Sequence, residues 1–251
     1  MNASNGKLPR LDICAIIEMC FAHHHLCHPA FGNPLIVNNK RLCTSNEIET
    51  NVEKMDSREK SYKHLYNKAQ TEYDLRWHRE SIPSLLIDIL SKMPAGSNVL
   101  DIGCGTGVYS CYMAEKGFNV TGIDFIERAI EFAKHRARDK NVVVDFQKVD
   151  IAKWEANRKY QLIFDSGCLH SMDKEYREVY KQNILKLANN QTIYILLHFG
   201  RRHFLDFSFA GPKRYSKHKI LDFFSPEFKL NTFFIEPKSK GLFHYQFVKT
   251  N

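Results

Sequence analysis

The chain has 251 residues, of which 43% are hydrophobic and 25% charged, which is the composition of a globular protein with room for one large α/β domain and an extension. Its apolar stretches fall far short of the ~20 residues that span a bilayer, and residues 11–20 include Asp12 and Glu18 and lack a small-residue cleavage site, so we expect neither a membrane span nor a secretory signal. The net charge of +8 is compatible with a nucleic-acid surface, but the basic residues are scattered, so nucleic-acid binding is the less favoured alternative.

Residues 1–55 have no sustained periodicity and are predicted to form an irregular extension before a domain that covers residues 56–251. Cysteine and histidine side chains are concentrated in residues 20–28, where their sulfur and imidazole groups could bind zinc. Their spacing matches no recognised zinc finger, so a histidine-rich helix or tail is favoured and no metal site is predicted. The odd number of cysteines, seven, favours reduced thiols and a cytoplasmic location. The cluster consists of Cys20, His23, His24, His25, Cys27 and His28.

Two helices are expected before the first strand. Residues 56–74 are charged and permit a helix, with apolar residues at i, i+3, i+4 and i+7 that predict a face covering the ligand pocket. Tyr73, Trp77 and His78 follow, where they either approach a substrate or pack on the core. Residues 81–92 predict a second helix with Ser81 as its cap. The apolar face of the first helix consists of Tyr62, Leu65, Tyr66 and Ala69.

The most informative stretch, residues 99–107, joins a short apolar strand to a helix through three alternating glycines. Gly103, Gly105 and Gly107 lack a Cβ atom, so a ligand can lie directly against main-chain N–H groups. A dinucleotide fingerprint would need glycine at position 108, where Val108 stands. A glycine-rich turn can also be a plain surface loop, but the order of strand, turn, helix and strand favours a nucleotide site.

The second strand, residues 119–124, ends in a carboxylate. Asp124 comes 23 positions after Asp101, near the ~20-residue interval at which an acidic residue meets the ribose hydroxyls in Rossmann units. The two oxygens of a carboxylate suit the two hydroxyls. We therefore predict that Asp124 holds a ribose.

Strand-length and helix-length segments alternate through the rest of the chain, which predicts a parallel sheet. Two β-rich runs near the end, 229–236 and 242–249, are separated by Pro237 and Gly241 and predict an antiparallel hairpin. The expected fold is thus α/β, a Rossmann-like doubly wound and mostly parallel sheet ending in an antiparallel hairpin, with a helical N-terminal extension. The earlier strands are expected near 98–102, 119–124, 142–148, 160–165 and 192–199, and the helices near 108–116, 126–138 and 174–187.

Ligands of an open α/β sheet collect beyond the carboxyl ends of the strands, so residues 164–170 at the end of the fourth strand are expected to form the active-site edge. His170 is the candidate base by its pKa and its position, or it caps the helix that starts near Lys174. Cys168 is expected to be a wall residue, because nothing adjacent in the sequence would depress the pKa of its thiol.

The alternating glycines, with Asp101 before them, resemble the first motif of the Rossmann-like S-adenosylmethionine-dependent methyltransferases. The string at 164–170, with Arg177 and Tyr180 after it and Gly-Pro-Lys-Arg at 211–214, is similar to small-molecule enzymes related to the thiopurine S-methyltransferases, over roughly residues 70–250. The resemblance implies a parallel sheet ending in a hairpin and S-adenosylmethionine as the cofactor.

The resemblance also assigns roles to individual residues. Asp150 would meet the adenine amino group, or else be a solvated loop carboxylate, and Ile151 would lie against the ring. Asp165 would lie near the methionine moiety or organise the loop that follows it. The full set of cofactor-binding candidates is Asp101, Gly103, Gly105, Gly107, Asp124, Phe125, Asp150, Ile151 and Asp165.

The activity that the resemblance implies is methyl transfer to a small molecule, either a thiol or an aromatic hydroxyl. A hydroxyl acceptor needs a base, for which His170 is the candidate, whereas an acidic thiol needs none. The string Asp165–Cys168 lacks the polar-Pro-Pro-aromatic motif of enzymes that methylate base amines. An RNA or protein methyltransferase and an inactive cofactor-binding scaffold stay open as alternatives, and no oligomeric state is predicted. Substrate contacts are expected from Tyr73, Trp77, Cys168 and Arg201, the last in an aromatic and basic insertion that either roofs the acceptor pocket or faces water.

Overall fold

The structure is a computed structural model that describes residues 36–37, 40–41, 59–156, 158–202, 214–237, 239 and 241–250. The chain divides into two compact units, residues 1–49 and residues 50–251. In the first unit, β1 (Ile36–Val37) and β2 (Lys40–Arg41) form an antiparallel pair. The predicted cluster of cysteines and histidines at 20–28 lies outside the described residues.

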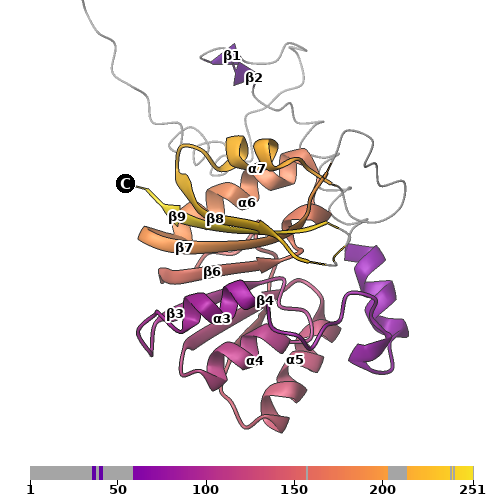
Figure 1. The fold of residues 1–251 in the computed structure, drawn as a ribbon. Coiled ribbons are helices and arrows are strands. Elements are labelled where there is room, and N and C mark those ends of the chain that lie inside the picture. The colour runs from indigo at the N-terminus through magenta and orange to yellow at the C-terminus, as the bar shows by residue number, and fades with distance from the viewer. Residues whose placement is uncertain are drawn as a thin grey trace, which may run out of the picture. The chain divides into compact units, whose positions relative to one another are not determined.

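The second unit is built on a seven-stranded sheet with the strand order β5-β4-β3-β6-β7-β9-β8 (Figure 1). Strands β5, β4, β3, β6 and β7 run parallel, and β9 pairs antiparallel with both β7 and β8. The predicted fold class is therefore confirmed. The strands are β3 (Asn98–Ile102), β4 (Asn119–Asp124), β5 (Asp145–Lys148), β6 (Tyr160–Ser166), β7 (Ala188–Phe199), β8 (Phe228–Ile235) and β9 (Leu242–Lys249).

Helices cover both faces of the sheet. Helices α3 (Ser84–Leu90), α4 (Val108–Glu115) and α5 (Glu127–Asp139) lie on one face, and α6 (Lys174–Leu187) and α7 (Lys217–Phe224) lie on the other (Figure 1). The remaining described helical elements are a helix over residues 59–68 and the short 3-10 helices η1 (Glu72–Asp74) and η2 (Leu169–Ser171).

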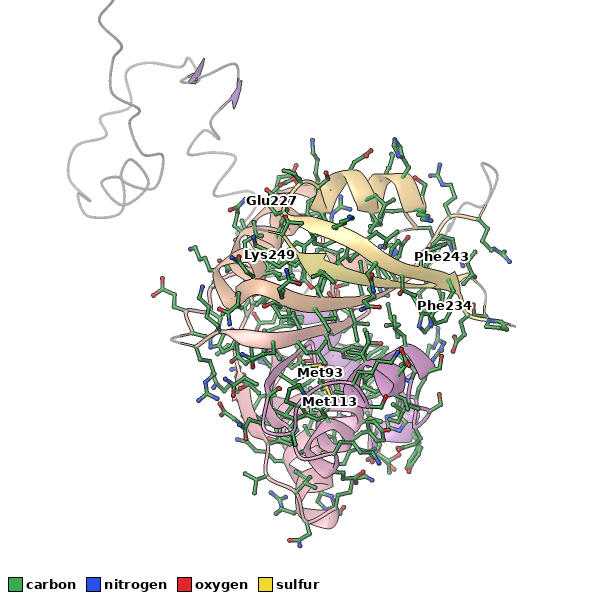
Figure 2. All side chains as sticks on the ribbon, turned by 60° about the vertical axis from the view of Figure 1, so that its left-hand side comes forward. Met93, Met113, Glu227, Phe234, Phe243 and Lys249 are labelled. Atoms are coloured by element: carbon green, nitrogen blue, oxygen red, sulfur yellow. The ribbon has the colours of Figure 1, made fainter. Side chains whose placement is uncertain are left out.

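The core consists of two main apolar clusters, one on each side of the sheet, because successive side chains of a strand point to opposite faces. In β7, Ile195 packs in the cluster that includes Leu86 of α3, and Tyr194 packs in the cluster that includes Phe224 of α7. Met113 of α4 belongs to the first cluster, and Figure 2 shows it beside Met93, below the sheet. The same view shows Phe234 and Phe243 at one end of the β8–β9 hairpin and Glu227 and Lys249 near the other.

The sheet reverses its strand order between β3 and β6. The chain proceeds from β3 outward through β4 and β5, and then returns to the other side of β3 with β6 and β7. Ile102 of β3 pairs with Asp165 of β6, and a Cβ at Gly103 would lie 3.1 Å from the Cβ of Cys168. The loops after these two strands therefore touch at the topological switch point, where open α/β sheets bind their ligands.

Three local predictions need correction. The helix that was expected to have Ser81 as its cap begins at Ser84 instead. The backbone of Pro83 is extended rather than helical, so Pro83 is the N-cap residue. The third strand begins at Asp145 rather than at residue 142. Leu65, expected on the buried face of its helix, is 46% exposed.

Helix α7 was not predicted. A helix signal is present there nonetheless: the hydroxyl of Ser216 caps the helix by accepting the N–H of Lys219 at 3.3 Å. Ile220 and Phe224, four residues apart, are buried on the same face of the helix.

Candidate functional site

The turn between β3 and α4 has the left-handed backbone that its glycines predict. The φ angle is +68° at Gly103, +55° at Gly105 and +77° at Gly107. A Cβ at Gly107 would lie 2.8 Å from the Cβ of Ala133 in α5, and one at Gly105 would lie 3.2 Å from the hydroxyl oxygen of Tyr66. The backbone conformation therefore favours glycine at all three positions, and at Gly107 the space available also excludes a Cβ.

Two of the predicted cofactor carboxylates lie beside this turn. Asp101 in β3 is 1% exposed and accepts a hydrogen bond from the hydroxyl of Ser110 at 2.5 Å. Asp124, at the end of β4, accepts the N–H of Gly105 at 3.1 Å and the N–H of Ile126 at 2.9 Å. The structure thus brings Asp124 into direct contact with the glycine turn.

Asp165, at the end of β6, is fully buried, and both of its carboxyl oxygens accept hydrogen bonds. The N–H groups of Cys168 and Leu169 donate to it at 2.7 and 3.0 Å, and the hydroxyl of Tyr180 in α6 donates at 2.5 Å. Of the two roles left open for Asp165, these contacts support the organisation of the loop.

Burial raises the pKa values of all three carboxyls. The pKa of Asp101 rises to about 7, because burial is reinforced by the charges of Asp165 and Asp124 and only partly opposed by the Ser110 hydroxyl. The pKa values of Asp124 and Asp165 rise to about 6, with burial as the largest cause. No lysine or arginine among the described residues is a principal influence on any of the three pKa values. A cation bound here would therefore stabilise the ionised form of these carboxyls.

The loop after β5 lies next to Asp124, since the N–H of Val149 donates to the Asp124 carbonyl at 2.9 Å. Asp150 in this loop accepts a hydrogen bond from the hydroxyl of Tyr176 in α6, so its carboxylate is held rather than freely solvated. Ile151 is 4% exposed and belongs to the core cluster. Both candidates thus lie in the loop that follows the strand beside β4.

Aromatic residues that precede the first strand cover the turn. The indole N–H of Trp77 donates to the hydroxyl of Tyr66 at 3.4 Å, and its ring lies edge-on to Tyr62 and Tyr66, with 5.6 Å between ring centroids in each pair. Phe125 lies edge-on to Tyr62 at 5.9 Å. Tyr73, in contrast, is 70% exposed. Trp77 therefore packs against Tyr62 and Tyr66 of the predicted cover while it is 41% exposed itself, and Tyr73 lies mostly in solvent.

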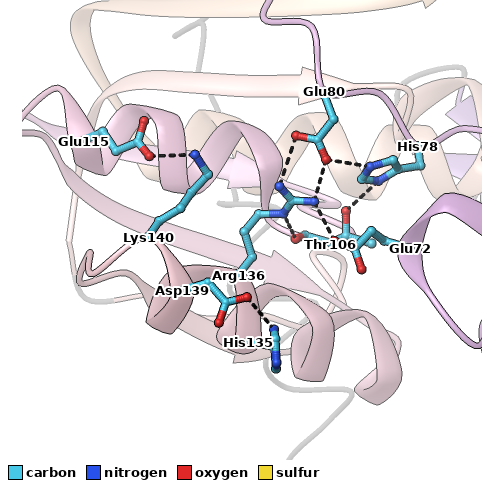
Figure 3. Close-up of polar contacts among 9 residues, drawn as sticks. All are labelled: Glu72, His78, Glu80, Thr106, Glu115, His135, Arg136, Asp139 and Lys140. Carbon is cyan, nitrogen blue, oxygen red and sulfur yellow. Dashed lines mark hydrogen bonds and ion pairs between the residues drawn. The ribbon is translucent and has the colours of Figure 1, made fainter.

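The buried guanidinium of Arg136 connects the segment that precedes the first strand to the glycine turn (Figure 3). Arg136 of α5 is 8% exposed, and its Nε donates to the carbonyl of Thr106 at 3.1 Å. Its terminal nitrogens donate to Glu80 at 2.8 and 3.1 Å and to Glu72 at 2.9 Å. One ring nitrogen of His78 lies 3.1 Å from the hydroxyl of Thr106, and the other lies 2.8 Å from the Glu80 carboxylate. Sequence reasoning missed this network.

His170 lies in η2, on the loop that Asp165 organises. The carboxylate of Asp173, not His170, caps α6 by accepting the N–H of Tyr176 at 3.0 Å. Burial lowers the pKa of His170 to about 4, and its Nδ1 is buried with no hydrogen-bond partner among the described residues. A Cβ at Gly167 would lie 3.0 Å from Cε1 of His170, so the ring packs directly on the loop backbone.

A second imidazole lies against the first. His198 of β7 is 0% exposed, and its ring is edge-on to His170 with 5.6 Å between centroids. Burial lowers the pKa of His198 to about 3, the charges of His170 and Arg177 lower it further, and a backbone hydrogen bond at Phe199 opposes them. His198 was hidden from sequence reasoning within an apolar strand. The signal that could have identified it is an ionisable residue within an otherwise apolar run of the sequence.

Cys168 follows the end of β6, and Arg201 follows the end of the neighbouring strand β7. Cys168 is half-buried, and its sulfur would lie 3.3 Å from a Cβ at Gly103, which is the position of a wall residue. The backbone N–H of Arg201 donates to the carbonyl of Tyr215 at 2.9 Å. Residues 203–213, which include most of the predicted aromatic insertion, lie outside the described residues.

In the described part of the chain, no helix is both long and apolar enough to cross a membrane. Within the same residues, no three histidine, cysteine, aspartate or glutamate side chains gather into a group that could hold a metal ion.

A family model described as a methyltransferase domain matches residues 94–210. A 2-heptyl-1-hydroxyquinolin-4(1H)-one methyltransferase of Mycobacteroides abscessus is 32% identical over 121 residues, which cover 47% of this chain and 53% of that protein. An uncharacterised methyltransferase of Schizosaccharomyces pombe is 30% identical over 121 residues, which cover 83% of its length. The chain thus spans about half of the first relative and most of the second.

Among solved structures, the N-methyltransferase NodS of Bradyrhizobium japonicum in complex with S-adenosylhomocysteine has a TM-score of 0.63. The sequence identity is 14%, and the match covers 77% of this chain and 99% of that chain. At this identity, the likeness supports the fold.

Proposed function

The chain belongs to the S-adenosylmethionine-dependent methyltransferase family, and from this premise we propose that it transfers a methyl group to a small-molecule acceptor, either an aromatic hydroxyl or a thiol. Family membership confirms the expected enzyme class and cofactor. The acceptor and the roles of individual residues belong to the proposal, and the subgroup related to thiopurine S-methyltransferases stays a prediction.

The observation that carries the proposal is the trio of buried carboxyls at the carboxyl edge of the sheet, Asp101, Asp124 and Asp165. Burial raises their pKa values and no lysine or arginine of the described residues is among the principal causes, so a bound cation would stabilise their ionised form. S-adenosylmethionine carries two positive groups, a sulfonium and an ammonium. The glycine turn beside the carboxyls supplies the close backbone approach that a nucleoside needs.

The residues divide the binding of this cofactor between them. Asp124 would grip the ribose hydroxyls, with the N–H of Gly105 released from its present bond to the carboxylate. Asp150 and Ile151 would hold the adenine, and Phe125 and Trp77 would cover the nucleoside. When bound, S-adenosylmethionine supplies a methyl group that is attached to a sulfonium, and a nucleophile can attack this methyl group directly and displace the sulfur. The protein then needs only to align the acceptor and exclude water.

His170 would remove the proton of a hydroxyl acceptor. The His170 ring is neutral at pH 7 and can accept a proton, and its lowered pKa makes it a weaker base than a free imidazole. Cys168 would form a wall of the acceptor site, and Arg201 and Tyr73 would contribute contacts at its edge. A hydroxyl is favoured over an acidic thiol by the presence of a buried base, since a thiolate needs none.

The test is to incubate the purified chain with labelled S-adenosylmethionine and a panel of phenols, thiols, amines and RNA. We expect Asp124→Ala to weaken cofactor binding strongly, and His170→Ala to lower turnover while cofactor affinity is kept. The exposed pair His135 and Asp139 supplies matched controls, His135→Ala and Asp139→Ala, which should change neither quantity.

Two results would contradict these roles. Equal loss of cofactor binding in Asp124→Ala and His170→Ala would remove the distinction between a binding residue and a base. Methylation of RNA in preference to every small molecule would transfer the proposal to a nucleic-acid substrate, and binding without any turnover would favour a scaffold.

A further inference from the structure

Helix α6 carries three polar side chains on its buried face. Tyr176, Tyr180 and Asn183 occupy positions i, i+4 and i+7, a spacing that places them on the same side of a helix. They are 6%, 0% and 8% exposed. Buried polar groups are costly unless hydrogen bonds satisfy them, so the partners of these three side chains indicate what this face of the helix does.

Tyr180 reaches the acceptor loop, by which we mean residues 167–171 after β6. Its hydroxyl donates to Asp165 at 2.5 Å, and the N–H groups of Cys168 and Leu169 donate to the same carboxyl at 2.7 and 3.0 Å. Burial raises the pKa of Asp165, and the Tyr180 hydroxyl is the largest of the influences that oppose this rise. Tyr180 therefore favours the ionised carboxyl, which can accept all three hydrogen bonds.

Tyr194 of β7 extends this contact into a chain of hydrogen bonds. The hydroxyl oxygens of Tyr180 and Tyr194 lie 3.1 Å apart. A tyrosine hydroxyl has a single proton, and Tyr180 gives its proton to Asp165, so Tyr194 is the donor to Tyr180. Both tyrosines are 0% exposed, and in a buried chain each hydrogen bond strengthens the next. The chain ends on the backbone of the acceptor loop.

The other two polar side chains reach the nucleoside loop, by which we mean residues 149–153 after β5. The side-chain N–H of Asn183 donates to the carbonyl of Ile151 at 2.6 Å. The hydroxyl of Tyr176 donates to Asp150, and the same carboxyl oxygen accepts the N–H of Ala152 at 3.0 Å. One face of α6 thus forms hydrogen bonds with the loops that follow two different strands of the sheet.

We propose that Tyr180 is the positioning residue of the acceptor loop and Asn183 that of the nucleoside loop, so that one helix face sets the distance between acceptor and cofactor. The roles of the two loops rest on the function proposed above. A direct displacement requires the acceptor to lie in line with the methyl group, and a misplacement of about 1 Å can lower the rate ~100-fold. Neither side chain needs to touch the cofactor or the acceptor for this effect.

Three substitutions separate the two positioning residues. Tyr180→Phe keeps the ring and removes the hydroxyl that donates to Asp165. Tyr194→Phe removes the far end of the same chain and should have a smaller effect, because the bond from Tyr180 to Asp165 is kept. Asn183→Leu has a similar volume and removes the donor to the Ile151 carbonyl. If Asn183→Leu does not fold, Asn183→Ala removes the same donor without a larger side chain.

A matched control for the loss of a buried hydroxyl is present in the same core. Tyr245 of β9 is 0% exposed and belongs to the apolar cluster that includes Tyr180 and Tyr194. Its buried hydroxyl oxygen has no hydrogen-bond partner among the described residues. Tyr245→Phe therefore removes the same chemical group from the same cluster without breaking a hydrogen bond to either loop.

The first experiment measures amide hydrogen exchange by NMR in the wild-type chain and the four variants without cofactor. In Tyr180→Phe, exchange at Cys168 and Leu169 should accelerate at least roughly tenfold, because a hydrogen bond to a charged group is lost, while exchange at Ala152 stays near the wild type. In Asn183→Leu, exchange at Ala152 should accelerate, while exchange at Cys168 and Leu169 stays near the wild type.

The second experiment separates binding from turnover. In Tyr180→Phe, kcat should decrease roughly 10-fold or more, while the affinity for S-adenosylhomocysteine in titration calorimetry stays near that of the wild type. In Asn183→Leu, this affinity should decrease roughly 3- to 10-fold, and kcat should change less than in Tyr180→Phe. Tyr245→Phe should resemble the wild type in both measurements.

Unchanged exchange at Cys168 and Leu169 in a folded Tyr180→Phe protein would overturn the inference. Equal acceleration of both loops in either variant, or in Tyr245→Phe, would do the same, because it would show a general loosening of the core. Hydrogen exchange requires no turnover. An absence of methyl transfer by the wild type to every acceptor would therefore refute the proposed function, while the exchange rates would still decide whether α6 positions the two loops.

Discussion

The Arg136 network offers the sharpest test of how the site is held together, because its two sides differ in burial (Figure 3). The guanidinium side chain is 9% exposed, whereas the side chains of Glu72 and Glu80 are 27% and 48% exposed. Removing the carboxylate charges with the double variant Glu72→Gln and Glu80→Gln leaves a buried cation. Arg136→Met instead leaves two carboxylates that water can reach. We predict that the double variant loses more stability than Arg136→Met.

The magnitudes follow from the contacts. Breaking a fully buried ion pair from one side costs ~3–5 kcal/mol. Because Glu80 is half-exposed and glutamine oxygens can still accept hydrogen bonds, we reduce the expected loss for the double variant to ~2–3 kcal/mol. Arg136→Met mainly loses the bond to the carbonyl of Thr106 and the pairing of partly exposed acids, for about 1–2 kcal/mol. In a domain of this size these losses lower Tm by roughly 5–10 °C and 2–6 °C.

The assay is urea unfolding at pH 7.5, followed by circular dichroism, at low and high salt. Glu131→Gln is the control, because Glu131 pairs with Arg128 on the same helix at the surface, where a pair contributes ~0–1 kcal/mol and salt weakens it. The variants of the buried network should keep most of their effect at high salt. The reasoning is refuted if Arg136→Met is the more damaging change, or if salt abolishes both effects.

Three further predictions concern the carboxyls and the turn. Cofactor affinity should decrease below about pH 6, by roughly tenfold at pH 5, because Asp124 must be ionised to hold the ribose. Titration calorimetry between pH 5 and 8 should show this decrease in the wild type. The decrease should be absent in Asp124→Asn. The unfolding free energy has the opposite dependence. Asp124 binds more protons in the folded state than in the unfolded chain between about pH 4 and 6, so its contribution to stability decreases as pH rises through this window. A stability of the wild type that increases relative to Asp124→Asn over this window would contradict the raised pKa of Asp124. Gly107→Ala should lower the unfolding free energy by at least ~1–3 kcal/mol in chemical denaturation, because the added Cβ would lie 2.8 Å from Ala133 at a φ of +77°. Gly96 also has a positive φ but has open space around it, so Gly96→Ala should lower the unfolding free energy by less.

The parts of this protein that the sequence determined by itself depend on local physics. Glycines at 103, 105 and 107 indicate a left-handed turn because other residues are strained there, and the structure has positive φ at all three. Asp124 ends the strand expected at 119–124, and its carboxylate accepts the N–H of Gly105 in the turn. The predicted helix at 174–187 agrees with α6 because its cap, Asp173, is adjacent to its apolar face.

The tertiary structure decided the features that join distant segments. Arg136 reaches Glu80 and Glu72 across 56 and 64 positions, and its own helix gives no indication of these partners. The chain order likewise hides the contact of His170 with His198, since the two meet only because β6 and β7 are neighbours in the sheet. Burial cannot be read from neighbouring residues, and burial is what raises the pKa of Asp101 and lowers that of His170. The sequence therefore indicated the glycine turn and the carboxyl that ends the next strand, and the packing of the sheet brought in Arg136 and His198 and determined which groups are buried.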